Sequence, residues 1–261
     1  MRRIGCIIAA AFAAFGMAAG AQAAGHVLSN PKAVVELFTS QGCSSCPPAD
    51  EVMKSLIRQG DVVALAYHVD YWNYLGWNDT LATKDNTARQ YAYSKALGRA
   101  GVYTPQAIVN GEDHANGRDL GGIRAKIEDL SRAGRGLTVP VNLSMNGQEI
   151  DIAIGAGPAD RKGTPHANVV VVYFDVAERV KVEKGENSGR DITYAHPVRD
   201  VQTIGMWDGS AKNFVLPRSV IEAADRNGCA ILLQATTPDG APGRILGAAS
   251  IVLGEAIHAA Q

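Results

Sequence analysis

VVELFTSQGCSSCPP, residues 34–48, carries two cysteines, Cys43 and Cys46, from the end of an apolar strand into the start of a helix. Backbone N–H groups at a helix N-terminus stabilise an anion, so a cysteine there is favoured as the thiolate, the form that attacks a disulfide. A second sulfur in C-x-x-C spacing resolves the mixed disulfide. We therefore expect a redox-active Cys43–Cys46 disulfide, with Cys43 as nucleophile, Cys46 as resolving thiol and no other cofactor.

A zinc half-site and an inert structural disulfide are the alternatives for this pair. A zinc site needs four ligands, usually including a second close pair, and the chain has no second C-x-x-C and no H-x-x-x-H. Cys229 lies in an apolar run, where a buried structural thiol is expected. Redox chemistry is the preferred hypothesis.

Two prolines, Pro47 and Pro48, directly follow the pair. Because proline has no N–H, the helix is expected to begin only at one of them, which leaves the dithiol in a looser turn with partial thiolate stabilisation. The hydroxyl groups of Ser44 and Ser45 are then candidate donors to the thiolate.

The N-terminus indicates secretion. Arg2 and Arg3 precede an uncharged run over residues 4–20, and residues 21–23 (AQA) supply a small-x-small cleavage site. This pattern predicts a signal peptide over residues 1–23 and a secreted, periplasmic protein. A membrane anchor is the alternative, but the run ends at a processing site instead of a basic flank.

Composition limits the partners. The chain is 46% hydrophobic and 20% charged, with 25 basic and 26 acidic side chains, so its formal net charge is −1. No basic block and no second hydrophobic span are present, so we expect no nucleic acid and, once the leader is removed, no membrane partner. The expected partner is a protein or small molecule with a thiol or disulfide. Oligomeric state and the direction of electron transfer stay open.

The first half alternates strands and helices. We predict a strand over 33–38, a helix over 49–59 and a strand over 62–69, which form a β-α-β unit with parallel strands. An aromatic-rich segment over 71–97, helical from about Thr87, follows as an insert. After the X-Pro pair Thr104–Pro105, a hairpin turns at Asn110-Gly111 and a helix covers 120–132.

This order resembles the thioredoxin superfamily, in which the dithiol follows the first strand. More closely, four segments resemble a bacterial family of secreted thioredoxin-like proteins catalogued as a domain of unknown function, DUF1223: residues 36–50 (ELFTSQGCSSCPPAD), 67–79 (YHVDYWNYLGWND), 103–111 (YTPQAIVNG) and 185–199 (GENSGRDITYAHPVR). The resemblance implies a thioredoxin-like domain over 30–135 and leaves the substrate open.

The second half reads as many short strands separated by Gly and Pro turns. We expect strands over 139–144, 150–154, 168–176, 198–207, 229–236 and 244–252, with a helix near 218–226. Short strands without crossover helices indicate an antiparallel β-sandwich-like domain over 137–254. The expected fold class is thus an α/β thioredoxin-like domain with a helical insert, followed by this sandwich.

The resemblance also assigns roles to three residues. Thr104 and Pro105 match the family's cis-proline loop, which lies opposite the dithiol; a trans bond is the ordinary alternative. Glu36 lies close to where related oxidoreductases hold a buried carboxylate that moves the resolving thiol's proton, and a solvated strand residue is the alternative.

Further residues are candidates for tuning the thiolate or lining a substrate wall. His68 and Asp70 end the second strand, where ligands gather in open α/β sheets. Trp72 belongs to an aromatic group that either flanks the site or packs the insert. Residues 185–190 and 196–199 place polar groups around turns, where they shape a cleft or only form the turns.

Three functions follow as hypotheses. The first is a secreted thiol–disulfide oxidoreductase that uses Cys43 and Cys46. The second is a Cu(I) metallochaperone that uses the same soft sulfurs, with Met53 or His68 nearby. The third is a non-enzymatic binding module whose β-rich half is its working surface.

Overall fold

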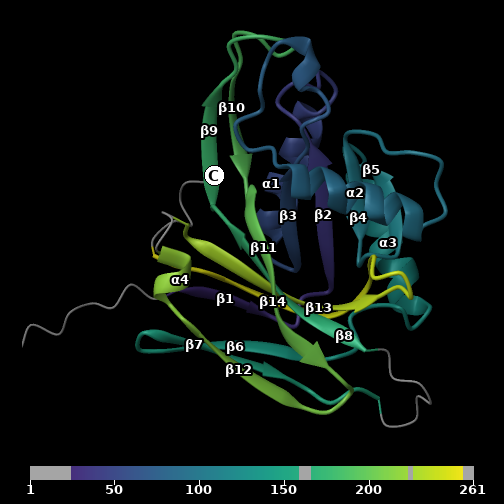
Figure 1. Ribbon diagram of the computed structural model, residues 1–261, viewed down its shortest axis with the longest axis vertical. Helices are drawn as coiled ribbons and strands as arrows, with labels where there is room; N and C mark the ends of the chain where they lie inside the picture. The colour runs from purple at the N-terminus through teal and green to yellow at the C-terminus, as the bar shows by residue number, and fades with distance from the viewer. Residues whose placement is uncertain (1–24, 159–165, 223–225, 255–261) are drawn as a thin grey trace, which may run out of the picture.

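The computed structural model describes residues 25–158, 166–222 and 226–254, so the predicted signal peptide lies outside the described residues. Within them 42% of residues are in strands and 21% in helices. The strands form four separate sheets (Figure 1). None of the helices in these ranges is both long and apolar enough to cross a membrane.

A four-stranded sheet with the order β3-β2-β4-β5 carries the cysteine motif. β2 (Ala33–Thr39) and β3 (Val62–His68) are parallel and joined through α1 (Pro47–Gln59), so the predicted β-α-β unit is confirmed. β4 (Gln106–Val109) and β5 (Asp113–Asn116) form the predicted hairpin, in which Gly111 has a positive φ of 68°. α1 and α3 (Leu120–Arg132) pack on one face of this sheet.

The segment between β3 and β4 contains a short 3-10 turn, η1 (Asn73–Leu75), and then α2 (Lys84–Ala96). α2 begins earlier than predicted because the Thr83 side chain accepts a hydrogen bond from the Asn86 amide and caps the helix there. The Thr104–Pro105 bond that follows is cis, as expected.

A five-stranded antiparallel sheet lies at the centre of the molecule, in the order β1-β14-β13-β8-β11. Its strands are β1 (His26–Ser29), β8 (Ala167–Phe174), β11 (Val198–Trp207), β13 (Gly228–Thr236) and β14 (Pro242–Val252). Successive side chains of a strand point to opposite faces. Val169 and Val171 therefore pack with the three-stranded sheet, and Val170 and Val172 with the four-stranded sheet.

The three-stranded sheet has the order β12-β7-β6 and covers the outer face of the central sheet. β6 (Val141–Asn146) and β7 (Glu149–Ile154) correspond to the strands predicted over 139–144 and 150–154, and they pair as a hairpin. β12 (Lys212–Pro217) adds to β7, and the short α4 (Ser219–Glu222) follows.

A two-stranded arm, β9 (Ala177–Lys181) and β10 (Asp191–Ala195), extends from the central sheet alongside α1 (Figure 1). It brings a segment from the second half of the chain to the cysteine motif of the first half.

The predicted fold class is wrong. The chain is mostly β, with four helices in the described residues, and an α/β thioredoxin-like domain with a helical insert followed by a sandwich does not describe it. Two features explain the error. The strand β1 precedes the cysteine motif yet pairs with β14 at the other end of the chain. The central sheet is buried on both faces, so it joins the two halves in one core and is not one layer of a separate sandwich.

Candidate functional site

Cys43 and Cys46 form a disulfide, with their Cα atoms 5.4 Å apart, and both are fully buried. They lie in two consecutive turns: the Cys43 amide donates to the Ser40 carbonyl (3.2 Å) and the Cys46 amide to the Cys43 carbonyl (3.1 Å). α1 begins at Pro47, with Cys46 as its N-cap residue. The prediction that the prolines delay the helix is confirmed.

The N-terminus of α1 provides little electrostatic or hydrogen-bond stabilisation to a thiolate at Cys43. Pro47 and Pro48 have no N–H, and the amides of Ala49 and Asp50 both donate to the Cys46 carbonyl (2.8 and 3.2 Å). The Ser45 hydroxyl lies 3.3 Å from the Cys43 sulfur. Ser45 is therefore the side chain placed to donate to this sulfur, while Ser44 is exposed and uses its backbone amide elsewhere.

Residues 182–190, the loop that joins β9 to β10, lie against the backbone of the cysteine motif, and we call them the cover loop. The Asn187 side-chain amide donates to the carbonyls of Gln41 and Cys43, at 2.9 Å in both cases. The Glu186 carboxylate accepts from the Ser44 amide (3.1 Å). These contacts hold the loop on both sides of Cys43, and Asn187 is only 1% exposed.

A buried carboxyl group, Asp50, lies one helical turn after Cys46. Its Oδ1 accepts a hydrogen bond from the Thr39 hydroxyl at 3.0 Å, whereas its buried Oδ2 has no hydrogen-bond partner among the described residues. Burial raises the pKa of Asp50 from 3.8 to about 7, against the opposing effects of His68 and Thr39. Asp50 therefore exchanges a proton near neutral pH.

His68 lies on the same face of the sheet as Thr39, its partner in the β2–β3 register. The His68 Nδ1 is 2.9 Å from Asp79 Oδ2, and the ring packs edge-on against Tyr194 of β10. Its Nε2 is buried with no hydrogen-bond partner in the described ranges. Asp50 Oδ2 and His68 Nε2 thus both lack a hydrogen-bond partner in this part of the structure, and the electrostatic effect of His68 lowers the pKa of Asp50 against the larger effect of burial.

Asp79 organises this cluster. It accepts from His68 and also from the amides of Gln41 (2.7 Å) and Leu81 (2.9 Å). Burial opposes ionisation, but these donors hold the pKa of Asp79 below its usual value. Asp79 is thus an ionised carboxylate that fixes both His68 and the strand end before Cys43.

Glu36 is on the other face of β2. It is fully buried, its carboxylate pairs with Arg89 (2.8 Å) and accepts a hydrogen bond from Tyr93, and Arg89 continues to Gln234 of β13 (2.9 Å). This network joins the two halves of the chain. Glu36 is thus buried, as the alternative of a solvated strand residue did not foresee, and it is held in an ion pair with Arg89.

Trp72 and Asp70, which the sequence also predicts to lie near the dithiol, make contacts with different parts of the structure. The Trp72 indole donates a hydrogen bond to the Thr104 hydroxyl (2.8 Å). Trp72 also packs against Gly42, because a Cβ atom added to Gly42 would lie only 3.1 Å from the Trp72 Cβ. Trp72 therefore contacts both Gly42, which precedes Cys43, and Thr104, which precedes Pro105. Asp70 instead accepts from Thr87 in α2 (2.7 Å).

Metal-ligating groups do not gather around the dithiol. Met53 is buried in the apolar core between α1 and the sheet, and His68 is engaged by Asp79. Within the described ranges, no cluster of three or more His, Cys, Asp or Glu side chains is arranged to hold a metal ion. Cys229 is a buried free thiol whose pKa burial raises to about 12.

Residues 34–234 match the family described as "Protein of unknown function (DUF1223)". The chain belongs to the DUF1223 family. This match includes the cysteine motif, Asp79 and the cover loop.

The DUF1223 chain is also similar to a solved structure, the crystal structure of protein AGR_C_4864 from Agrobacterium tumefaciens. The two sequences are 53% identical, the TM-score is 0.77, and the match covers 87% of this chain and 96% of that one. No curated protein matches the chain.

Sequence reasoning missed Asp50, Asp79 and Asn187. Asp50 could have been found, because residues four apart on a helix share a face and Asp50 is four residues after Cys46. Asn187 and Glu186 belong to the segment predicted to shape a cleft, but their contacts with the motif depend on the β9–β10 arm, which the sequence did not indicate.

Proposed function

We propose that this DUF1223 protein is a secreted thiol–disulfide oxidoreductase whose reactive pair is Cys43 and Cys46. The observation that supports this most is the buried carboxyl of Asp50, one helical turn from Cys46, with a pKa raised to about 7 and one free oxygen. An inert disulfide has no need of such a group, whereas exchange moves a proton to and from a cysteine sulfur.

In the oxidising direction a substrate thiolate attacks the Cys43 sulfur. The Cys43–Cys46 bond breaks, its electron pair passes to Cys46, and protonated Asp50 donates a proton to that sulfur. A second substrate thiolate then attacks the substrate sulfur of the mixed disulfide, which releases the oxidised substrate and the Cys43 thiolate. In the reducing direction the same steps run backwards, with ionised Asp50 accepting the Cys46 proton.

Three neighbouring residues support these roles. Ser45 stabilises the Cys43 thiolate, because its hydroxyl lies 3.3 Å from the sulfur while the nearby helix amides are engaged. Asp79 and His68 position the polar cluster around Asp50 and act through it.

The cover loop sets a condition on this reaction. Both cysteines are fully buried, and the Asn187 side-chain amide of the cover loop is hydrogen-bonded to the Cys43 carbonyl. Substrate sulfur therefore reaches Cys43 only when the cover loop moves away. Local opening of this kind is common where a loop is held by a few hydrogen bonds.

Equilibration of the full chain with glutathione buffers, followed by alkylation and mass spectrometry, tests the proposal. We expect reversible interconversion of the dithiol and disulfide between about −300 and −120 mV, the range of known exchange proteins. Cys43→Ala should abolish it, and Cys229→Ala should not, because Cys229 is a buried thiol apart from the pair. A disulfide that stays closed throughout this range would refute the proposal.

A further inference from the structure

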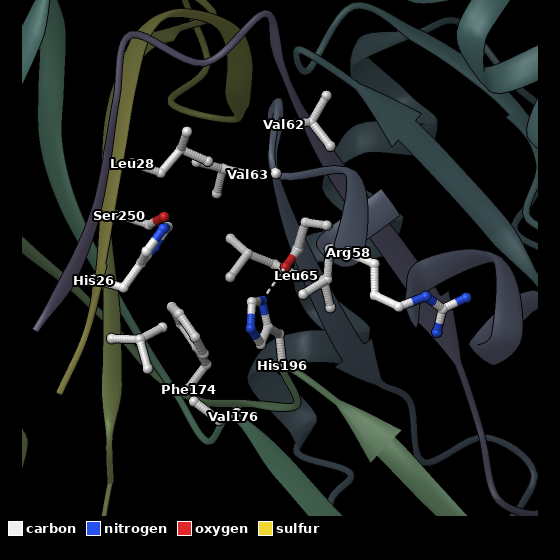
Figure 2. A pocket seen from close by; sticks show the side chains of 14 residues that line it. His26, Leu28, Arg58, Val62, Val63, Leu65, Phe174, Val176, His196 and Ser250 are labelled. Carbon is white, nitrogen blue, oxygen red and sulfur yellow. Dashed lines mark hydrogen bonds between the residues drawn. The ribbon is translucent and has the colours of Figure 1, made fainter. Parts of the chain in front are cut away.

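A cavity of about 390 Å³ lies at the opposite end of α1 from the disulfide (Figure 2). Its walls come from both halves of the chain: Val63 and Leu65 of β3 on one side, Leu28 of β1 and Phe174 of β8 on the other. The walls are mainly aliphatic and aromatic. Of the 14 lining residues none is Asp or Glu.

Besides Arg58, three polar side chains line this space: His26, His196 and Ser250. His196 follows β10, and its Nδ1 lies 2.9 Å from the Ala64 carbonyl oxygen. Because a carbonyl only accepts, Nδ1 carries the proton. Figure 2 shows the other ring nitrogen, Nε2, directed into the cavity, and it has no hydrogen-bond partner among the described residues.

The imidazole is neutral at physiological pH. Burial lowers the pKa of His196 from 6.5 to about 4, although the bond to Ala64 opposes this effect. With the proton on Nδ1, Nε2 presents a lone pair and is a hydrogen-bond acceptor only.

The fold holds this ring firmly. His196 has a φ of 49°, in the left-handed region that most side chains avoid. Its amide donates to the Val176 carbonyl (3.1 Å), its carbonyl accepts from the Ala66 amide (2.9 Å), and its ring packs on Phe174 with centroids 4.5 Å apart. A fixed acceptor in an apolar cavity is a specific recognition element.

We infer that this cavity is a binding site for an uncharged, mainly apolar molecule with one O–H donor, of which a substituted phenol is the simplest representative. The volume falls within the range of small-molecule sites, about 300–1,000 Å³. No carboxylate lines the cavity, and Figure 2 shows the Arg58 guanidinium directed away from it, which leaves the His26 and His196 imidazoles and the Ser250 hydroxyl as its polar groups. A donor on the ligand satisfies His196 Nε2, and the Ser250 hydroxyl and the His26 imidazole at the opposite wall are further polar contacts. The site is separate from the dithiol and independent of the proposed redox function.

Binding of 4-propylphenol and of 4-propylanisole to the full chain tests this inference. The two probes have nearly the same shape, but only the phenol has an O–H donor. By isothermal titration at pH 7.5 we expect the phenol to bind about tenfold more tightly. His196→Asn should remove this preference, because asparagine tolerates the left-handed backbone but does not place an acceptor at the Nε2 position.

A second measurement does not depend on a variant. The ¹⁵N resonance of His196 Nε2 in the unmodified protein should shift on titration with the phenol and stay in place with the anisole. Leu28→Trp, which fills the cavity from β1, should weaken both probes. Equal affinity for the two probes, no binding of the phenol, or an unmoved Nε2 resonance would overturn the inference.

Discussion

At the scale of single residues, Asp50 connects the stability of the protein to pH. Its pKa is about 7 in the folded chain and 3.8 without burial, so between these values the folded protein holds a proton that the unfolded chain has released. The contribution of Asp50 to stability is therefore greatest on the acid side of this window and is lost as the pH rises to about 7.

Asp50→Asn removes the free-energy cost of ionising a buried carboxyl group, because the amide carries no ionisable proton and its carbonyl still accepts a hydrogen bond from Thr39. We predict that at pH 8 the variant unfolds with a free energy about 2–4 kcal/mol higher than the native protein, and that the difference shrinks toward pH 4. Urea unfolding of the oxidised proteins at several pH values measures it.

Asp61→Asn is the matched control. Burial opposes ionisation there too, but hydrogen bonds from Lys32 and Arg124 lower the pKa of Asp61, so this substitution should reduce stability at pH 8. An Asp50→Asn protein that is less stable than the native one at pH 8, or a difference that does not change with pH, would contradict our assignment of Asp50.

The same substitution separates structure from catalysis. If Asp50 moves the Cys46 proton, Asp50→Asn should slow exchange about 10²-fold and flatten the rate between pH 6 and 8. Stopped-flow reduction by dithiothreitol gives this profile. A rate that falls without a change in its pH dependence would leave Asp50 with only a structural role.

At the scale of elements, the β9–β10 arm controls access to the disulfide. Asn187→Ala loses two hydrogen bonds, to Gln41 and Cys43, each contributing about 1 kcal/mol, so the cover loop should open more often and reduction by dithiothreitol should accelerate at least tenfold.

Ser188→Ala is the control for the cover loop. Ser188 also lies in the cover loop, but its hydroxyl bonds to the Glu183 carbonyl within the loop itself (2.8 Å). Dithiothreitol should therefore reduce the Ser188→Ala protein at the native rate. Equal rates for Asn187→Ala and the native protein would show that the loop does not limit access.

The elements that the sequence predicts well are those with strong local signals. The α3 bounds and the turn at Asn110-Gly111 match, because capping and turn residues act over short range. β1, β9, β10 and β12 were missed. Apolar and polar residues alternate only weakly along β9 and β10, and the two strands pair across a long loop. Their position therefore depends on packing against α1, which no local sequence pattern encodes.

At the scale of the whole molecule, the central sheet ties the two halves together. Val170 and Val172 pack against the four-stranded sheet while Val169 and Val171 pack against the three-stranded sheet. The unbroken valine run of β8 is consistent with burial on both faces, yet it does not say which segment covers the second face. The sequence therefore suggested two separate domains.

A shared core predicts cooperative unfolding. Trp72 reports on the cysteine motif and Trp207, 1% exposed, on the central and three-stranded sheets. We compare a Trp72→Phe, Trp77→Phe protein, which keeps Trp207, with a Trp207→Phe protein, which keeps Trp72 and Trp77. In urea, the fluorescence of each should give one transition whose midpoint coincides with that of the same protein by far-UV circular dichroism. Two transitions within one protein would show that the halves unfold separately.

The measurement that tests the central claim most directly is trapping on a Cys46→Ala, Cys229→Ala protein, which keeps Cys43 as its only cysteine apart from Cys6 in the predicted signal peptide. Mixed with oxidised glutathione or a disulfide-bonded protein and analysed by non-reducing mass spectrometry, it should accumulate a stable mixed disulfide at Cys43, because the resolving thiol is gone. The corresponding Cys43→Ala, Cys229→Ala protein, which keeps Cys46, should form far less. An absence of adduct at Cys43, or equal trapping at Cys46, would contradict the assignment of Cys43 as the reactive sulfur.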